Sequence, residues 1–477
     1  MQAFDFLLLA PEMVLTAGGL ALLMAAAFGG DKSSGLINAL AAIVLALAIV
    51  AVTRAPGADD ALGGVLRLDG FASYAKYLIF GSAIVSLLIA PRFFAGEGYR
   101  AEYPVLILFA ALGMSIMVSA HDLMSLYIGL ELNSLAAYVL ASFARNDGRS
   151  SEAGLKYFVL GALASGMLLY GSSLLYGFTG TTSFTGIATA FAHNGGIGLT
   201  FGIVFLLSGL AFKISAVPFH MWTPDVYEGA PTPVTAFFAT APKVAAMALL
   251  TRVCVDALQP AFPAWQQIIT FMAIASMVLG AVGAVGQKNI KRLLAYSSIA
   301  NVGFMLIGLA SATPAGIMAM LIYLAVYVVM TLGSFLVLLQ LQRADGTMAE
   351  DVASLAGLWK SRPALATALS VFMFSLAGIP PLFGFFPKLM VFQAAVGAGM
   401  LPLAVIGAVA SVIGAFYYLR VIKVMLFDAP ADEAFPIRGA VVERGLIAVA
   451  ALYVSVVGFI AVTPLTNAAG NAVRALL

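Results

Sequence analysis

The residues best suited to chemistry in this 477-residue chain are a few ionisable side chains inside long apolar stretches. Glu131 lies deep in one stretch and Lys243 in another, while Lys213 and Lys388 flank proline-containing interruptions. An ionisable group in hydrocarbon costs about 2.5–3.5 kcal/mol on insertion scales, so each of these four needs a reason to be there. If they face one interior layer, an acid followed by three amines predicts proton transfer.

A Glu131–Lys213 pair has the chemistry of a proton switch. Burial favours the neutral amine, whereas a nearby carboxylate favours the ammonium, so Lys213 would hold or release its proton as the pair tightens or loosens. Lysine suits this role because arginine effectively never deprotonates. His220, beside an interruption, is a candidate neutral bridge. Hydroxyl groups that could order water between the sites belong to Ser215, Thr223, Tyr296, Ser297 and Ser298.

Plainer roles compete with these assignments. Glu131 and Lys213 could form only a structural ion pair, although that leaves Lys243 and Lys388 unexplained. His220 could equally be a satisfied core histidine. Lysines near the end of an apolar stretch usually extend to the membrane interface.

Four further residues are assigned by position. Lys76 and Lys156 lie near the ends of their stretches. We expect Lys76 to reach the interface, and we keep Lys156 as a secondary member of the proton path. His121, at the edge of a stretch, is expected to be solvated, and Cys254 to be a small packing residue.

Composition excludes most cofactor chemistry. One cysteine and three histidines cannot supply an iron–sulfur cluster or a structural zinc site. Gly280, Gly283 and Gly286 follow no strand, so they are not a dinucleotide fingerprint, and the chain has no P-loop. A net charge of +2, without basic tracts, argues against a nucleic-acid partner. No cofactor is therefore predicted in this chain.

The elements that position these residues are membrane helices. Hydrophobic residues make up 62% of the chain and charged residues 10%, against about 45–50% and about 25% in soluble domains. We predict an all-α polytopic membrane protein with fourteen spans, because about 20 apolar residues cross a bilayer. They lie at residues 6–28, 36–53, 72–91, 104–119, 121–144, 153–178, 199–228, 234–257, 266–286, 292–311, 314–342, 363–398, 401–427 and 441–463.

The positive charges predict the orientation. If each loop takes the number of the span it follows, the odd loops and their flanks hold fifteen Lys or Arg. The even loops and the C-terminus hold four, which are Arg54, Arg67, Arg252 and Arg474. The positive-inside rule then places the odd loops in the cytoplasm and both termini outside.

Two predicted spans are interrupted by proline. Pro218 interrupts residues 199–228, and Pro380 with Pro381 interrupts residues 363–398. Proline removes a backbone donor and clashes with the preceding turn, so both should be broken helices. Broken helices occur at membrane depth only where they line a wet or protein-filled cavity.

The two interruptions also suggest an internal repeat. The pairs Phe212–Pro218 and Phe374–Pro380 are separated by 162 residues (374 − 212) and lie on spans of opposite direction. Such a pair points to inverted five-helix repeats, here spans four to eight and nine to thirteen. We therefore divide a single membrane domain, 1–477, into an N-terminal three-span segment (1–100), a first five-helix repeat (101–260), a second (261–430) and a C-terminal span (431–477).

Four runs of residues resemble a known family. They are Glu131–Leu132–Asn133–Ser134 with Tyr138, Lys156–Tyr157–Phe158 through Tyr170–Gly171, the stretch from Lys213 to Lys243, and Gln287–Lys288–Asn289–Ile290–Lys291–Arg292 through Tyr296–Ser297–Ser298. The chain resembles the antiporter-like membrane subunits of respiratory complex I, the proton-pumping NADH:quinone oxidoreductase. Val226–Tyr227–Glu228–Gly229 makes it most similar to the bacterial subunit N group.

The resemblance implies a proton path through Glu131, Lys213, Lys243 and Lys388. It implies a translocase subunit without redox chemistry of its own, in the bacterial inner membrane with periplasmic termini. NADH, FMN, iron–sulfur clusters and quinone would then belong to other membrane and peripheral subunits. The alternatives are a subunit of a multi-subunit sodium/proton antiporter, which shares the broken helices and lysines, and a non-conducting membrane scaffold.

Overall fold

A computed structural model describes residues 7–55, 59–94, 99–193, 196–343, 347–430, 435 and 441–477. Helices dominate these residues, and a two-stranded antiparallel pair joins β1 (Asp59–Ala61) to β2 (Leu66–Leu68). The α-helices are α2 (Ala10–Gly29), α3 (Ser34–Arg54), α4 (Gly70–Phe93), α5 (Glu102–Ser119), α6 (Leu123–Ala141), α7 (Gly148–Thr179), α8 (Phe184–His193), α9 (Ile197–Ile214), α10 (Trp222–Gly229), α11 (Thr232–Phe238), α12 (Ala241–Arg252), α13 (Phe262–Val285), α14 (Ile290–Ala310), α15 (Pro314–Leu338), α16 (Leu358–Ser361), α17 (Pro363–Ala377), α18 (Phe385–Gly397), α19 (Leu401–Phe427), α20 (Val441–Val454) and α21 (Val462–Leu476).

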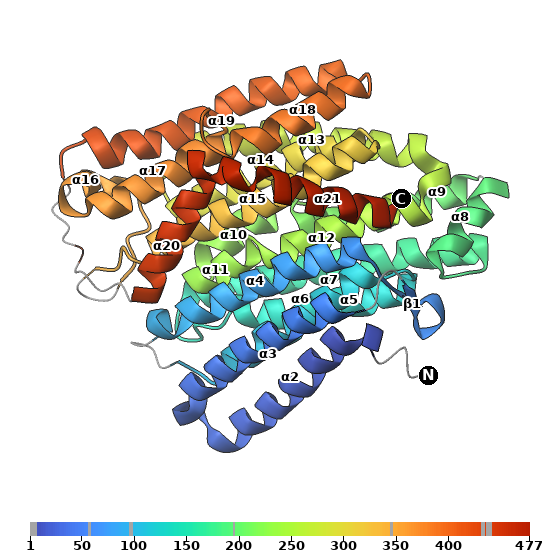
Figure 1. The fold of residues 1–477 in the computed structure, drawn as a ribbon, viewed down its shortest axis with the longest axis horizontal. Coiled ribbons are helices and arrows are strands. Elements are labelled where there is room, and N and C mark those ends of the chain that lie inside the picture. The colour runs from blue at the N-terminus through green and yellow to red at the C-terminus, as the bar shows by residue number, and fades with distance from the viewer. Residues whose placement is uncertain are drawn as a thin grey trace.

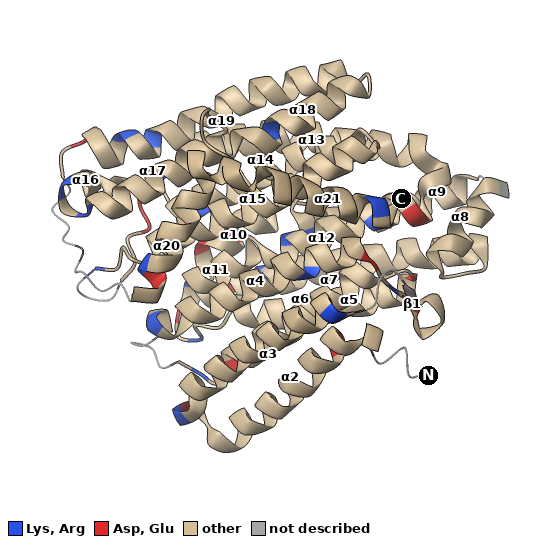
Figure 2. Ribbon diagram, in the orientation of Figure 1, with Lys and Arg blue, Asp and Glu red and all other residues tan. Residues whose placement is uncertain are grey.

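The predicted polytopic all-α fold is confirmed. In the described part of the chain, 13 helices are long and apolar enough to cross a membrane, and the shorter α17 and α18 together form one more span. The helices lie side by side and both chain ends lie toward the right of Figure 1. Figure 2 shows most of the ribbon free of charge, with the Lys, Arg, Asp and Glu in scattered patches.

Polar side chains start several helices where the apolar runs begin. An N-cap oxygen accepts a backbone N–H that would otherwise lack a partner, which fixes the first turn. Side-chain oxygens serve this role for α4, α6, α7, α14 and α15, and they belong to Asp69, Asp122, Asp147, Asn289 and Thr313. The centre of the bundle is formed by α14 and α15, whose most apolar windows are each 94% buried.

The fourteenth span differs from its prediction of 441–463. α20 ends at Val454, a 3₁₀ turn covers Val456–Ala461, and α21 follows. Ser455 causes this interruption, because its extended backbone leaves the helix and its side chain accepts the N–H of Val457. The long apolar helix at this end of the chain is consequently Val456–Leu476.

Both predicted breaks occur, and their backbones end in the same way. α9 ends at Ile214 and α17 at Ala377, and the residue after each is left-handed. That residue is Ser215, with φ 63°, in the first break and Gly378, with φ 74°, in the second. A left-handed residue directs the chain out of the helix and leaves the last carbonyls without helical partners.

The structural register of the two breaks is 163 residues, not the 162 inferred from the Phe and Pro pairs. The N–H of Ala216 donates to the carbonyl of Ala211, and the N–H of Ile379 donates to that of Phe374. The difference 374 − 211 gives 163, as does Gly378 against Ser215. The phenylalanines therefore occupy neighbouring positions, because the turn geometry and not the aromatic residue fixes the equivalence.

A third break was not predicted, in the span expected at 234–257. α11 ends at Phe238 and α12 begins at Ala241, with Thr240 between them at φ −126° and ψ −84°. Pro242 explains the interruption, because it lacks the N–H that would bond back to the preceding turn. The break places Lys243 in the first turn of a new helix.

Candidate functional site

Lys213 lies in the last turn of α9 and is buried against α6. Its Nζ donates to Ser134 Oγ at 2.7 Å and to Tyr138 OH at 3.5 Å. The Tyr138 ring also lies below the ammonium, at 5.6 Å from Nζ to the ring centroid. These contacts hold the lysine inside the bundle without a direct carboxylate.

Glu131 and Lys213 are linked through α6 and do not form a direct ion pair in the described residues. Glu131 accepts a hydrogen bond from Ser165 of α7. Ser134, which accepts from Lys213, follows Glu131 by three residues, and residues at that spacing are neighbours on a helix surface. Ser134 therefore stands between the acid and the amine, where a small rotation would change their separation.

Lys243 closes the first break and Lys388 closes the second. Lys243 Nζ donates to the carbonyl of Ile214 at 3.1 Å and to Ser215 Oγ at 2.9 Å. Lys388 Nζ donates to the carbonyl of Ala377 at 3.0 Å and to Ser411 Oγ at 3.2 Å. Ile214 and Ala377 are equivalent in the 163-residue register (377 − 214), so each broken helix has a lysine on the same terminal carbonyl.

The two helix ends offset part of the cost of burying the ammonium groups of Lys243 and Lys388. The carboxyl end of a helix carries about half a negative charge, and its last carbonyls lack partners. Both lysines are almost fully buried, so the helix end replaces the water that would otherwise solvate the ammonium. Any movement of a lysine away from its carbonyl would therefore favour proton release.

His220 is half-buried, and its Nδ1 is buried without a hydrogen-bond partner among the described residues. In the same part of the chain, its side chain makes no hydrogen bond with a site lysine. Pro218, Pro380 and Pro381 are exposed, and the backbone of the first break is fixed instead by Ser276 of α13, which accepts the N–H of Val217 at 2.9 Å.

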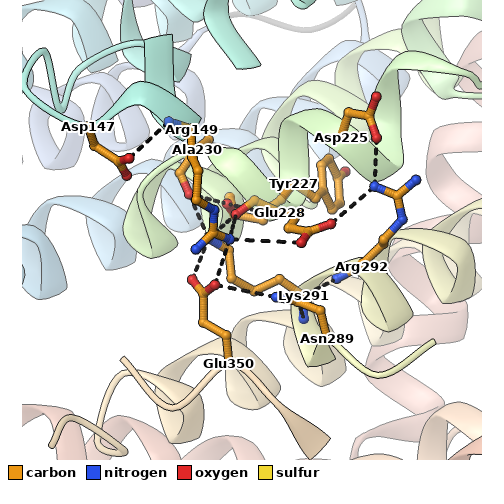
Figure 3. Close-up of polar contacts among 11 residues, drawn as sticks. Asp147, Arg149, Asp225, Tyr227, Glu228, Ala230, Asn289, Lys291, Arg292 and Glu350 are labelled. Atoms are coloured by element: carbon orange, nitrogen blue, oxygen red, sulfur yellow. Dashed lines mark hydrogen bonds and ion pairs between the residues drawn. The ribbon is translucent and has the colours of Figure 1, made fainter. Parts of the chain in front are cut away.

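Lys156 does not extend alone to the interface and joins a network of ion pairs. Its Nζ lies 2.9 Å from Asp225 and 2.7 Å from Glu152. Arg292 contacts the other oxygen of Asp225 at 2.6 Å and Glu228 at 3.1 Å. α7, α10 and α14 are thus joined at one end of the bundle (Figure 3).

Lys291, on α14, extends the same network into the bundle (Figure 3). Its buried Nζ donates to the carbonyls of Glu228 at 2.8 Å and Ala230 at 2.7 Å, at the carboxyl end of α10. Glu350 contacts both Lys291, at 3.2 Å, and Arg149, at 2.7 Å. Sequence reasoning missed this network because the acids and bases that pair are far apart along the chain.

A polar column runs through the bundle core beside Lys243. The Tyr227 ring lies 5.9 Å from Lys243 Nζ, and its hydroxyl is buried. Tyr327 OH donates to Ser298 Oγ at 2.8 Å, and Tyr323 OH donates to Asn301 Oδ1 at 2.8 Å. Ser298 and Asn301 of α14 therefore have protein hydrogen-bond partners in the core.

Two sequence assignments were wrong. Lys76 does not reach the interface: it is 1% exposed and pairs with Glu12 at 2.6 Å, while Ser115 donates to the same carboxylate at 2.6 Å. Glu12 is therefore a buried carboxylate in the membrane helices, whereas Glu131 is half-buried. His121 is not solvated but 2% exposed. Both errors arise because a position near a helix end is covered by other helices, which hydropathy does not reveal.

Known proteins resemble this chain in sequence. Residues 120–414 match the family model described as NADH:quinone oxidoreductase/Mrp antiporter, TM. The chain is 62% identical over 473 residues to NADH-quinone oxidoreductase subunit N of Sphingopyxis alaskensis, covering 99% of each chain. It is 58% identical to the protein of the same name from Rhizorhabdus wittichii, covering 98% of each.

Solved structures resemble this chain in fold. A chain of respiratory complex I from Thermus thermophilus with bound aureothin matches with a TM-score of 0.80 and 33% identity, covering 93% of this chain and 96% of that one. A chain of the Mrp complex from Dietzia matches with a TM-score of 0.85 at 21% identity, covering 100% and 98%. At that identity the Mrp likeness concerns the fold alone.

Proposed function

Because the chain belongs to the NADH:quinone oxidoreductase/Mrp antiporter family, and within it to the subunit N proteins of NADH-quinone oxidoreductase, we propose that Glu131, Lys213, Lys243 and Lys388 carry protons across the membrane. The chain is an antiporter-like, multi-pass membrane subunit of that complex. The redox cofactors belong to its other subunits.

The observation that carries this proposal is the pair of lysines on the two broken helices. A lysine held by a helix end stays protonated, and loses its proton when the contact opens. Lys243 and Lys388 have this contact at equivalent carbonyls, while Lys213 is held by Ser134 next to Glu131. A change in the charge of Glu131 would weaken the contacts that hold Lys213. The altered electrostatics would then change the protonation of Lys243 and Lys388.

The contacts and the sequence identities also bear on the alternative functions. A purely structural Glu131–Lys213 ion pair is not favoured, because the two groups lack direct contact. The sodium/proton antiporter alternative draws on the Mrp fold, at 21% identity, against 62% for a subunit N relative. A scaffold leaves three buried amines without a role.

The proposal also includes the location of the chain in the cell and its division into repeats. The chain lies in a bacterial inner membrane with both termini on the periplasmic side, as the distribution of basic residues predicts. Its repeats comprise residues 101–260 and 261–430, related by inversion, and the shared backbone turns of the two breaks support that division. His220 and Lys156 are secondary: one lacks a proton partner in the site, and the other belongs to the ion-pair network.

The test is the number of protons moved per electron by the whole complex in vesicles. Lys243→Gln should lower this ratio while NADH oxidation by the other subunits continues. Lys423→Gln is a matched control, because Lys423 is exposed and pairs only with Asp428 at the surface. An unchanged ratio in an assembled Lys243→Gln complex would contradict the proposal.

A further inference from the structure

A second cluster of buried charges lies outside the proposed proton path. Arg252, at the end of α12, is fully buried, and its two guanidinium nitrogens donate to both oxygens of Asp69 at 2.8 and 2.9 Å. Asp69 also accepts the N–H of Ala72 at the start of α4. One guanidinium and one carboxylate in this bidentate geometry neutralise each other.

Asp256 adds a carboxylate that this pair does not neutralise. It lies in the turn Val253–Ala257, with Oδ2 3.6 Å from Arg252 Nη1 and 3.6 Å from His121 Nδ1. Asp256 Oδ2 and both His121 nitrogens are buried without a hydrogen-bond partner in the described residues. A buried imidazole without any partner is costly, so these atoms point to a bound species.

The other charged groups around the cluster are already paired. Arg67, on β2, lies 3.0 Å from Asp60. Asp122 accepts hydrogen bonds from Thr182 Oγ1 at 2.6 Å and from the N–H of Met124. The Phe184 ring also packs against His121, at 5.5 Å between centroids. Among the described residues, the imidazole of His121 and the Oδ2 atom of Asp256 thus face each other without a hydrogen-bond partner.

We propose that His121 and Asp256 bind one proton between them, forming a second proton-binding site at the far end of the helix that carries Lys243. Lys243 begins α12 and Asp256 follows its end, about 20 Å apart at 1.5 Å per residue. The site lies at the opposite end of α7 from Arg149, since Thr182 follows that helix and Arg149 begins it.

The location gives the site a role. Under the proposed orientation, the ion-pair network of Figure 3 lies at the cytoplasmic end and His121 at the periplasmic end. A proton held there would exchange with the periplasmic phase. The site itself rests only on the cluster geometry, so it stands whether or not Lys243 conducts protons.

Infrared difference spectra of the purified complex between pH 8 and pH 5 (about three pH units around the usual histidine value) test the proposal. The parent complex should show a band from either a protonated carboxyl or an imidazolium. That band should disappear in Asp256→Asn and in His121→Gln. Asp60→Asn, which removes an exposed carboxylate on the same face, should leave it unchanged.

The proposed site would be ruled out if the spectra of both variants superimposed on the parent spectrum. If Asp256→Asn does not assemble, His121→Gln alone decides, because it leaves the Asp69–Arg252 pair intact. The proton-to-electron ratio of the same samples separates the two proposals. Loss of the band with an unchanged ratio supports the binding site and leaves the Lys243 path to its own test.

Discussion

The buried lysines of this chain are held by different kinds of partner. Lys243 and Lys388 are held by helix ends, whereas Lys76 is held by a carboxylate. An ammonium on a helix end can lose its proton and remain hydrogen-bonded, but an ammonium paired with a buried carboxylate cannot do so without leaving a bare charge. This difference separates candidate proton carriers from structural ion pairs at the level of single residues.

The Glu12–Lys76 pair should therefore behave as a structural element. Glu12→Gln leaves the buried ammonium of Lys76 without its counter-charge, and removal of one partner from a buried pair typically costs about 3–5 kcal/mol. The free energy of unfolding from denaturant titration of the solubilised complex measures this.

The double replacement Glu12→Leu with Lys76→Met is the control, since replacing a buried pair by apolar residues is often neutral or stabilising. It should restore stability and leave the proton-to-electron ratio of the parent. A ratio that falls in the double variant would show that the pair belongs to the proton path.

At the scale of helices, the sequence predicted what local chemistry determines. Except for the last span, the apolar runs predicted the spans to within a few residues, and Pro218 and Pro380 predicted two breaks. The break before Lys243 was missed because Pro242 falls within a span that reads as continuously apolar. Pro242 interrupts its helix as Pro218 and Pro380 do, but no glycine or polar run beside it marks the break in the sequence.

Contacts between helices lay beyond sequence reasoning. Lys76 meets Glu12 and His121 meets Asp256 only after folding, and no periodicity along one helix records its neighbour's face. The four proposed site residues were selected for a different reason, since their cost in hydrocarbon marks them individually. Their partners, which are carbonyls and hydroxyls, are present in every helix and carry no such signal.

Glu350 shows how one loop residue joins several elements. It connects the segment after α15 to α7 through Arg149 and to α14 through Lys291. Burial raises the pKa of Glu350, but the two cations more than offset this, so its pKa lies below the usual range. The ionised form therefore stabilises the folded chain.

This contribution depends on pH with a definite sign. It is fully present above the unfolded value of about 4.3 and is lost as pH falls through the lower folded pKa. Glu350→Gln should lower stability at pH 7 by about 1–3 kcal/mol, the cost of leaving a buried group unpaired, and should flatten the acid side of the stability curve. Thermal unfolding of the complex from pH 7 down to about pH 3 measures both effects; an unaltered acid limb would argue against the pairing.

Control for this experiment comes from Glu102, an exposed acid at the start of α5. Its replacement by Gln removes the same charge from the chain without breaking a buried contact. Only a small change is expected, since an exposed acid in a first helical turn contributes about 0.3–1 kcal/mol.

At the scale of the whole molecule, the two ends of the bundle carry different charged clusters, and this difference supports the proposed orientation. The network of Arg149, Lys291 and Arg292 (Figure 3), which Lys156 joins through Asp225, lies at one end, and the cluster of Arg252 with two aspartates lies at the other. Even the buried arginine at that end is neutralised by a carboxylate, so it adds no net positive charge to the face.

Labelling of engineered cysteines should establish this orientation. Gln259 follows α12 and Lys360 lies in α16, both are exposed, and they belong to loops predicted on opposite sides. In intact cells a membrane-impermeant maleimide should label Gln259→Cys and not Lys360→Cys, and inverted membrane vesicles should give the opposite result. The native Cys254 is buried and provides the unlabelled baseline in the parent chain. The reverse labelling pattern would show that the bundle has the opposite orientation in the membrane. The His121–Asp256 site would then lie on the side where protons are taken up.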